Sequence, residues 1–168
     1  MRGGAGWRAA RFPRRTDVVV RGRIGRWPLG VSTDRLGVTA LRGAGLLRRL
    51  AASGFPVDRA AEGRLFEVYP GGALRIWGFD TTKYRMDATR RATLLATLQQ
   101  RAPWFDVGAF AALAVASADA FDAMIAALAT RAAATGRLVR PGAEDLEVAR
   151  REGWVALPEG EVEELARP

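Results

Sequence analysis

Three acidic residues are the strongest candidates for chemistry in this sequence. Asp119 and Asp122 lie three positions apart in the stretch 117–129, where the other residues are small or apolar. Glu67 lies in the middle of the apolar and aromatic run 65–69. A carboxylate in such surroundings is costly unless an arginine or a metal ion neutralises it. If the two segments pack together, the three acids form a cluster of the kind that holds divalent ions over a phosphodiester.

Other catalytic residue sets are absent, because the sequence contains no cysteine and no histidine. Disulfide bonds, thiolate and imidazole metal sites and the commonest general base are therefore excluded. Chemistry must depend on carboxylates, hydroxyls, the single lysine Lys83 or bound cations. Because oxygen atoms would be the ligands, a metal site here favours a hard ion, magnesium or manganese.

Each acid also has a purely structural interpretation. On a helix that begins after Ser117, Asp119 falls in the first turn, where the helix dipole stabilises a carboxylate by about 0.3–1 kcal/mol. Asp122 lies one turn deeper, on an alanine-rich face that lets another element approach closely, and it requires a partner there. For Glu67 the alternative is a buried arginine partner. An Asp-x-x-Asp pair alone is a weak indication of a metal site, and its weight comes from the combination with Glu67.

The elements that would position these acids follow from apolar spacing and from turn residues. Helices are predicted from Ser32 to about Ala52, at 73–77 after Pro70-Gly71-Gly72, after Asp87 as far as 102–104, and from Ser117 to about Ala134. The runs 65–69 and 153–158 are typical of strands. The segments 17–21 and 107–116 fit either a strand or a helix, and the last ten residues are expected to form a frayed end.

The net charge of +8 is concentrated near the N-terminus. Residues 1–50 carry 12 arginines against Asp17 and Asp34, whereas the remainder of the chain has an excess of two acids. Clustered cations of this kind suit a phosphate backbone, so nucleic acid is a candidate partner through the N-terminal arginines. The alternative is that the abundance of arginine and alanine reflects genome composition.

A membrane location is not expected. No apolar run is long enough to span a bilayer, and residues 1–15 lack the apolar stretch that a secretory signal needs behind its positive end. We therefore expect a cytoplasmic protein without membrane contacts.

Several segments, in the same order, are similar to a known family. They are R-R-T-D at 14–17, P-L-G-V-S-T-D-R-L-G at 28–37, E-V-Y-P-G-G-A-L-R-I-W-G at 67–78, D-A-F-D-A at 119–123 and E-G-W-V-A-L-P at 152–158. Together they resemble the family known as domain of unknown function 429, whose members are described as predicted nucleases with a ribonuclease H-like fold. The resemblance runs from about Arg14 to Pro158.

The resemblance implies an α/β fold, with a ribonuclease H-like mixed sheet flanked by helices. Glu67 would lie on the central fourth strand, and Asp119 and Asp122 would form the pair on the final helix, much as in Holliday-junction resolvases of the same fold. The Tyr-Lys pair of the family corresponds to Tyr84 and Arg85. The family-like motifs also include Asp17 and Asp34, which we expect to act as helix caps or arginine partners.

The N-terminus departs from the family pattern. Family members begin with an Asp-bearing strand, and nothing before Arg14 matches it. We expect either a start at an internal Met of a longer reading frame or a truncation that removed the first three strands. The organisation would then be an Arg/Gly-rich arm at 1–16, a single truncated ribonuclease H-like domain at 17–158 and an acidic tail at 159–168. The uncovered sheet edge predicts a tendency to self-associate.

The leading functional hypothesis is a metal-dependent nuclease-like domain with Glu67, Asp119 and Asp122 as magnesium or manganese ligands. Without the first-strand Asp, weak metal binding and little or no hydrolysis are predicted. A catalytically inert nucleic-acid-binding or scaffold module on the same fold is the second hypothesis. The third is a buried network of arginines and carboxylates that holds no ligand.

Overall fold

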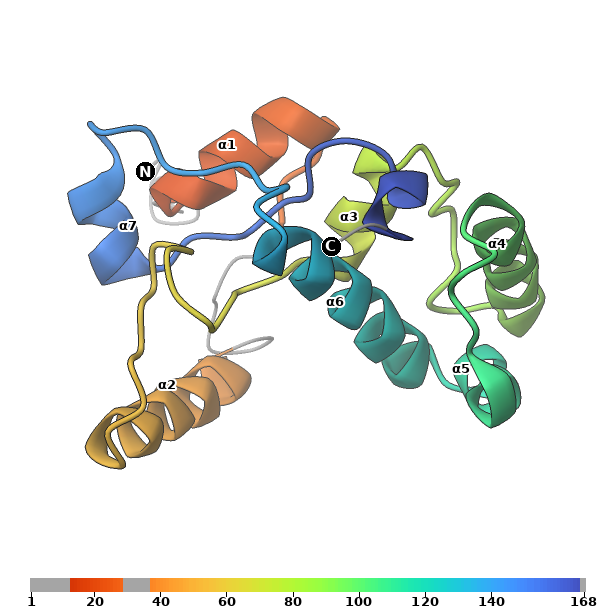
Figure 1. Cartoon of the computed structure of the whole chain (residues 1–168), viewed down its shortest axis with the longest axis horizontal. Coiled ribbons are helices and arrows are strands. Elements are labelled where there is room, and N and C mark those ends of the chain that lie inside the picture. Colours follow the sequence, from red (N-terminus) through yellow and green to blue (C-terminus); the bar gives the residue numbers. More distant parts are fainter. Residues whose placement is uncertain (1–12, 29–36, 167–168) are drawn as a thin grey trace, which may run out of the picture. The chain divides into compact units, whose positions relative to one another are not determined.

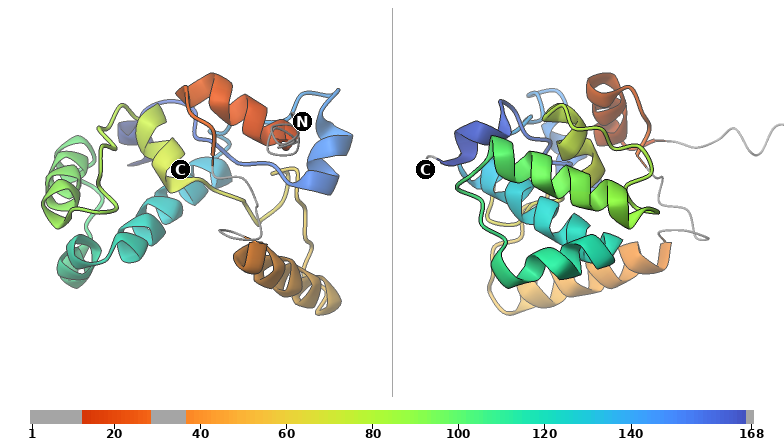
Figure 2. Two further views of the ribbon diagram at one scale, coloured as in Figure 1. Left: turned by 180° about the vertical axis from the view of Figure 1, so that it is seen from behind. Right: turned by 90° about the vertical axis from the view of Figure 1, so that its right-hand side faces the viewer.

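The computed structural model describes residues 13–28 and 37–166, and all of their regular elements are helical (Figure 1, Figure 2). The predicted arm at 1–16 therefore lies mostly outside the described residues, as do Ser32 and Asp34. Contacts divide the chain into two compact units. The first unit comprises Met1–Leu65 with Pro141–Trp154, and the second comprises Phe66–Arg140 with Val155–Pro168.

The predicted ribonuclease H-like mixed sheet is wrong, because the described residues contain no strand. In the part of the chain that the structure describes, pairing is limited to two isolated bridges, a parallel one between Glu67 and Val155 and an antiparallel one between Leu138 and Pro158. Between these bridges the Leu157 amide donates to the Val155 carbonyl at 2.9 Å. A hydrogen bond between residues two positions apart defines a γ-turn. The turn redirects the chain before a ladder can extend. The described residues consequently offer no sheet edge for self-association.

Helix α6 (Ala118–Ala134) is central to the second unit and matches the prediction for that segment. The Ser117 hydroxyl accepts a hydrogen bond from the Ala120 amide at 3.2 Å, and Gly136 follows the helix with a φ of +82°. Its apolar face is buried, including Phe121 and Ile125. It packs against α3 (Pro70–Ile76), α4 (Ala88–Arg101), α5 (Ala111–Ala116) and the 3-10 helix η3 (Val162–Ala166).

Two further predicted helices of this unit are confirmed. Helix α4 begins after Asp87, whose carboxylate accepts from the Thr89 amide at 2.8 Å, and buries three leucines as expected. Helix α3 begins at Pro70, and Gly78 follows its end with a φ of +76°. The ambiguous segment 107–116 is helical, comprising the 3-10 helix η2 (Gly108–Phe110) and α5, and Figure 1 shows α4 and α5 at the N-terminal end of α6.

Residues 162–166 form a packed 3-10 helix, η3, in contrast to the predicted frayed end. Val162 and Leu165 of η3 are fully buried in the core of the second unit. Arg101, near the end of α4, reaches this segment and pairs with Glu161 at 2.9 Å and Glu163 at 2.6 Å. Arg131 on α6 donates to the Leu165 carbonyl at 2.6 Å. Two of the acidic residues thus form ion pairs with Arg101 that link η3 to α4.

The first unit contains α1 (Arg15–Ile24), α2 (Gly37–Ala52) and α7 (Leu146–Glu152). Asp17 acts as predicted, since its Oδ2 accepts from the Arg14 amide and its Oδ1 pairs with Arg14 Nη2, both at 3.1 Å. Arg15 at the start of α1 pairs with Asp145, the residue before α7, at 2.7 Å. Helix α2 ends where expected, before Ser53 and Gly54. None of the described helices is long and apolar enough to cross a membrane.

Candidate functional site

Asp119 and Asp122 share one cationic partner, the guanidinium of Arg85. Arg85 Nη2 lies 2.8 Å from Asp119 Oδ1, and Arg85 Nη1 donates to Asp122 Oδ2. The acids lie three positions apart on α6 and are neighbours on its surface, so a planar guanidinium can bind both at once. Of the two partners foreseen for a carboxylate at position 122, an arginine or a metal ion, the structure contains the arginine.

Asp122 is the more enclosed acid of the pair. Its side chain is 16% exposed, compared with 90% for Asp119. Its second oxygen, Oδ1, accepts a 2.8 Å hydrogen bond from the Tyr84 hydroxyl. The Tyr84 ring packs against Phe121, with the ring centroids 5.7 Å apart, and burial raises the pKa of Tyr84. Tyr84 therefore stays protonated at neutral pH and orients Asp122, whereas Asp119 faces solvent.

Tyr84 and Arg85 are presented by the turn between α3 and α4. Lys83 has a left-handed backbone, with a φ of +56°, and its carbonyl accepts from the Met86 and Asp87 amides. This turn folds the chain directly before the first residue of α4. The site thus combines the turn at 83–87 with the first two turns of α6.

Arg91 links the turn at 83–87 to the residues that precede α6. Its side chain is only 5% exposed, and it donates to the carbonyls of Tyr84 at 2.8 Å, Val115 at 2.8 Å and Ala116 at 3.1 Å. The last two carbonyls end α5, directly before the cap residue Ser117. One buried guanidinium therefore ties the Tyr84 backbone to the start of the helix that carries the acids.

The glycines of the E-V-Y-P-G-G segment allow α3 to pack closely against Tyr69 and Tyr84. A Cβ atom at Gly72 would lie 2.6 Å from Tyr69 Cδ1 and 3.1 Å from Leu157 Cδ2, which is too close. A Cβ atom at Gly71 would lie 3.4 Å from the Tyr84 hydroxyl oxygen, at the edge of ordinary contact. Glycine at position 72 therefore allows α3 to pack closely against Tyr69 and Leu157.

Glu67 does not join the acid pair in a cluster. It is exposed, and its backbone carbonyl accepts from the Ala156 amide at 2.8 Å. Within residues 13–28 and 37–166, no group of three acidic side chains is arranged to hold one metal ion. The structure therefore brings together two of the three predicted site residues, Asp119 and Asp122, and places Glu67 apart from them.

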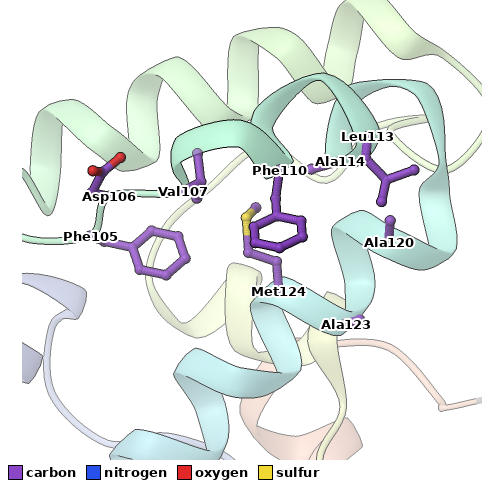
Figure 3. A pocket seen from close by; sticks show the side chains of 9 residues that line it. All are labelled: Phe105, Asp106, Val107, Phe110, Leu113, Ala114, Ala120, Ala123 and Met124. Carbon is purple, nitrogen blue, oxygen red and sulfur yellow. The ribbon is translucent and has the colours of Figure 1, made fainter.

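An apolar pocket lies against another face of α6. Its volume is about 380 Å³, and Ala120 and Ala123, which line it, directly follow Asp119 and Asp122 in the chain. Figure 3 shows Phe105, Phe110 and Met124 around its centre, with Asp106 at its edge. The Asp106 carboxylate accepts from the Gly108 amide at 2.8 Å. The pocket supplies apolar surface, and the polar chemistry of this region lies with the acid pair.

Sequence reasoning named Arg85 only as the counterpart of a family lysine and missed Arg91 entirely. A usable signal for Arg91 existed, since it precedes Leu94, Leu95 and Leu98 at the spacing of one buried helical face. An arginine on an otherwise apolar, buried helix face indicates a guanidinium that donates hydrogen bonds to buried acceptors. Neither partner of Asp122 carried a local signal in the sequence, because Tyr84 lies 38 positions away and Arg85 lies 37 positions away.

Comparison with known proteins gives one match. The sequence pattern of a family described as "Protein of unknown function (DUF429)" matches residues 5–146. Neither a curated protein nor a solved structure matches the chain significantly.

Proposed function

The chain belongs to the DUF429 family, and we propose that it is a divalent-cation-dependent, nuclease-like domain that acts on phosphodiesters through Asp119 and Asp122. The observation that carries this proposal is the shared guanidinium, because the two carboxylates lie on either side of one cation. Tyr84 supports the assignment by orienting the enclosed acid while the other faces solvent.

The donor set suits magnesium or manganese. Both acids offer oxygen atoms, and magnesium commonly takes only one or two carboxylates together with water and substrate phosphate oxygens. Bound there, such an ion supplies Lewis-acid polarisation of the phosphoryl oxygen and a lowered pKa for a neighbouring water. With two acidic ligands, affinity in the absence of substrate is expected to be low.

The residues of the chain provide orientation and charge rather than an imidazole base. In hydrolysis the oxygen of water forms a bond to phosphorus, and the bond from phosphorus to the leaving sugar oxygen breaks. One proton of the water goes to the leaving sugar oxygen, and the other goes to the product phosphate. Tyr84 keeps Asp122 in one orientation, and the exposed Asp119 is open to substrate and solvent. The 12 arginines among residues 1–50 are suited to phosphate contacts, and Arg42, Arg48 and Arg49 are exposed on α2.

One observation favours a second function, a catalytically inert nucleic-acid-binding or scaffold module. The Arg85 guanidinium already satisfies both carboxylates without a metal ion. In that case nucleic acid would bind through the arginines, with a strong dependence on salt, and no strand would be cut.

Manganese-dependent cleavage of single- and double-stranded DNA and RNA separates the two functions. We expect slow cleavage by the native chain, its loss in Asp122→Asn, and its retention in Glu147→Gln, which removes one exposed carboxylate of the first unit. Cleavage that survives Asp122→Asn would exclude the acid pair as its source. Salt-sensitive binding without any cleavage would establish the inert module.

A further inference from the structure

We infer that Arg85 is a substrate-operated counterion, which neutralises the acid pair at rest and moves to a phosphodiester when substrate arrives. The acid pair is then available to a divalent ion only when phosphate is present. The inference rests on the proposed function for the identity of the substrate, and it adds how occupation of the site is regulated.

The first step is that Arg85 and a divalent ion exclude each other. The guanidinium occupies Asp119 Oδ1 and Asp122 Oδ2, the oxygens that a cation between the two acids would use. With Arg85 in place, the group of two acids and one arginine carries a formal charge of −1. When Arg85 leaves, the pair carries −2 and attracts a divalent cation strongly, whereas a remaining guanidinium would repel it.

The second step is that Arg85 can leave without disturbing the turn. Its side chain is 53% exposed and Asp119 is 90% exposed, so water can replace that ion pair. Asp122 is 16% exposed, and it keeps the hydrogen bond from Tyr84 when Arg85 leaves. The backbone of the turn need not move with the side chain. Tyr84 is held independently, through its hydroxyl by Asp122 and through its carbonyl by Arg91.

The third step is that a phosphodiester is a suitable competitor for Arg85. A guanidinium forms bidentate hydrogen bonds with phosphate oxygens as readily as with carboxylates. Lys83, two residues earlier on the same exposed turn, adds a second cation for the same anion. A phosphate drawn to this turn would lie beside the acid pair it has uncovered, which is where a cleavable phosphodiester has to be.

Thermodynamic linkage converts these steps into a measurable quantity. If phosphodiester binding removes Arg85 from the acids, it raises the affinity for the divalent ion, and the ion must raise the affinity for phosphodiester by the same factor. A chain in which residue 85 cannot pair with the acids should bind the ion more tightly than the native chain without phosphodiester. Its linkage should be smaller, because only the phosphate oxygens that ligate the ion directly contribute to it.

The test is calorimetric titration of the full chain with manganese, with and without dimethyl phosphate, at matched ionic strength. For the native chain we expect dimethyl phosphate to raise manganese affinity about five-fold or more, the lower end of typical couplings. Arg85→Met should bind manganese more tightly than the native chain in the absence of dimethyl phosphate. Dimethyl phosphate should raise the manganese affinity of Arg85→Met by a clearly smaller factor than that of the native chain, because only direct ligation of the ion by phosphate oxygens remains. Arg90→Met is the matched control, because Arg90 is also 53% exposed and pairs with Asp80 instead; it should behave like the native chain.

The outcomes separate this inference from the proposed function. Equal manganese affinity in the native chain and Arg85→Met, with the same effect of dimethyl phosphate on both, would overturn the counterion role while retaining the acid pair as a metal site. Absence of manganese binding in the native chain and in Arg85→Met, under both conditions, would overturn the proposed function and this inference with it. Loss of binding in Asp122→Asn is expected, and unchanged binding there would show that the ion sits elsewhere.

Discussion

The Tyr84 hydroxyl donates a 2.8 Å hydrogen bond to Asp122, joining the turn before α4 to the second turn of α6. Asp122 thus has two partners and little exposure, whereas Asp119 has one partner and is almost fully exposed. We expect Asp122→Asn to lower the free energy of unfolding by about 1–2 kcal/mol, because a charged hydrogen-bond partner of Arg85 is lost. Asp119→Asn should change it by less than about 0.5 kcal/mol. Urea unfolding of both variants measures the difference, and equal effects would contradict the distinct environments.

Arg91 is predicted to be critical for stability. Arg91→Met would leave the carbonyls of Tyr84, Val115 and Ala116 without their buried donor, which should cost about 3 kcal/mol or more in the free energy of unfolding. Arg91→Lys should recover only part of this loss, since one ammonium cannot reproduce the fork of a guanidinium. Arg90→Met, its neighbour on the exposed side of α4, provides the control. An Arg91→Met chain as stable as that control would refute the positioning role.

The link between α4 and η3 should weaken in acid. The hydrogen bond from Arg101 lowers the pKa of Glu163 below its ordinary value of 4.5. A group whose pKa is depressed by folding stabilises the fold above its unfolded pKa, and this contribution disappears as the pH falls through the folded pKa. Urea midpoints of the native chain and Glu163→Gln should therefore differ at pH 7 and converge as the pH falls below about 4.5. A gap that stays constant down to about pH 3 would show that Glu163 does not contribute through its charge.

The two glycines at the start of α3 should respond differently to substitution. Gly72→Ala forces a Cβ atom against Tyr69 and Leu157, and overpacking of this kind costs about 1–3 kcal/mol. Gly71→Ala meets only the Tyr84 hydroxyl oxygen at 3.4 Å, and the better helix propensity of alanine offsets that contact. Thermal unfolding of the two variants gives the comparison. A Gly72→Ala chain as stable as Gly71→Ala would contradict the close packing of α3.

The helices could be predicted from the sequence because their signals are local. Helices follow Ser117 and Asp87 as expected, and apolar residues at helical spacing are buried as expected on α4 and α6. The sheet could not be predicted reliably, because buried extended chain has the same apolar composition whether or not partner strands are present. The run 153–158 illustrates this: Val155, Ala156 and Leu157 are buried, yet a turn limits each side to one bridge.

The candidate site was predictable in part for the same reason. That Asp122 requires a partner follows from its position on an alanine-rich helix face, and the partner is Arg85. The identity of that partner depends on how the turn at 83–87 packs against α6, which involves residues far apart in the sequence. Glu67 was grouped with the pair on the expectation that its segment was a central strand, and without a sheet that expectation has no support.

We propose that Asp119 and Asp122 flank one cation position, which Arg85 and a divalent ion occupy in turn. The most direct measurement is an anomalous difference map from crystals of the chain grown with manganese and dimethyl phosphate. A single peak bound by carboxylate oxygens of Asp119 and Asp122, with Arg85 turned away onto the phosphate, is the predicted result. A map without a peak at this pair, with Arg85 still paired to both acids at saturating manganese, would contradict it.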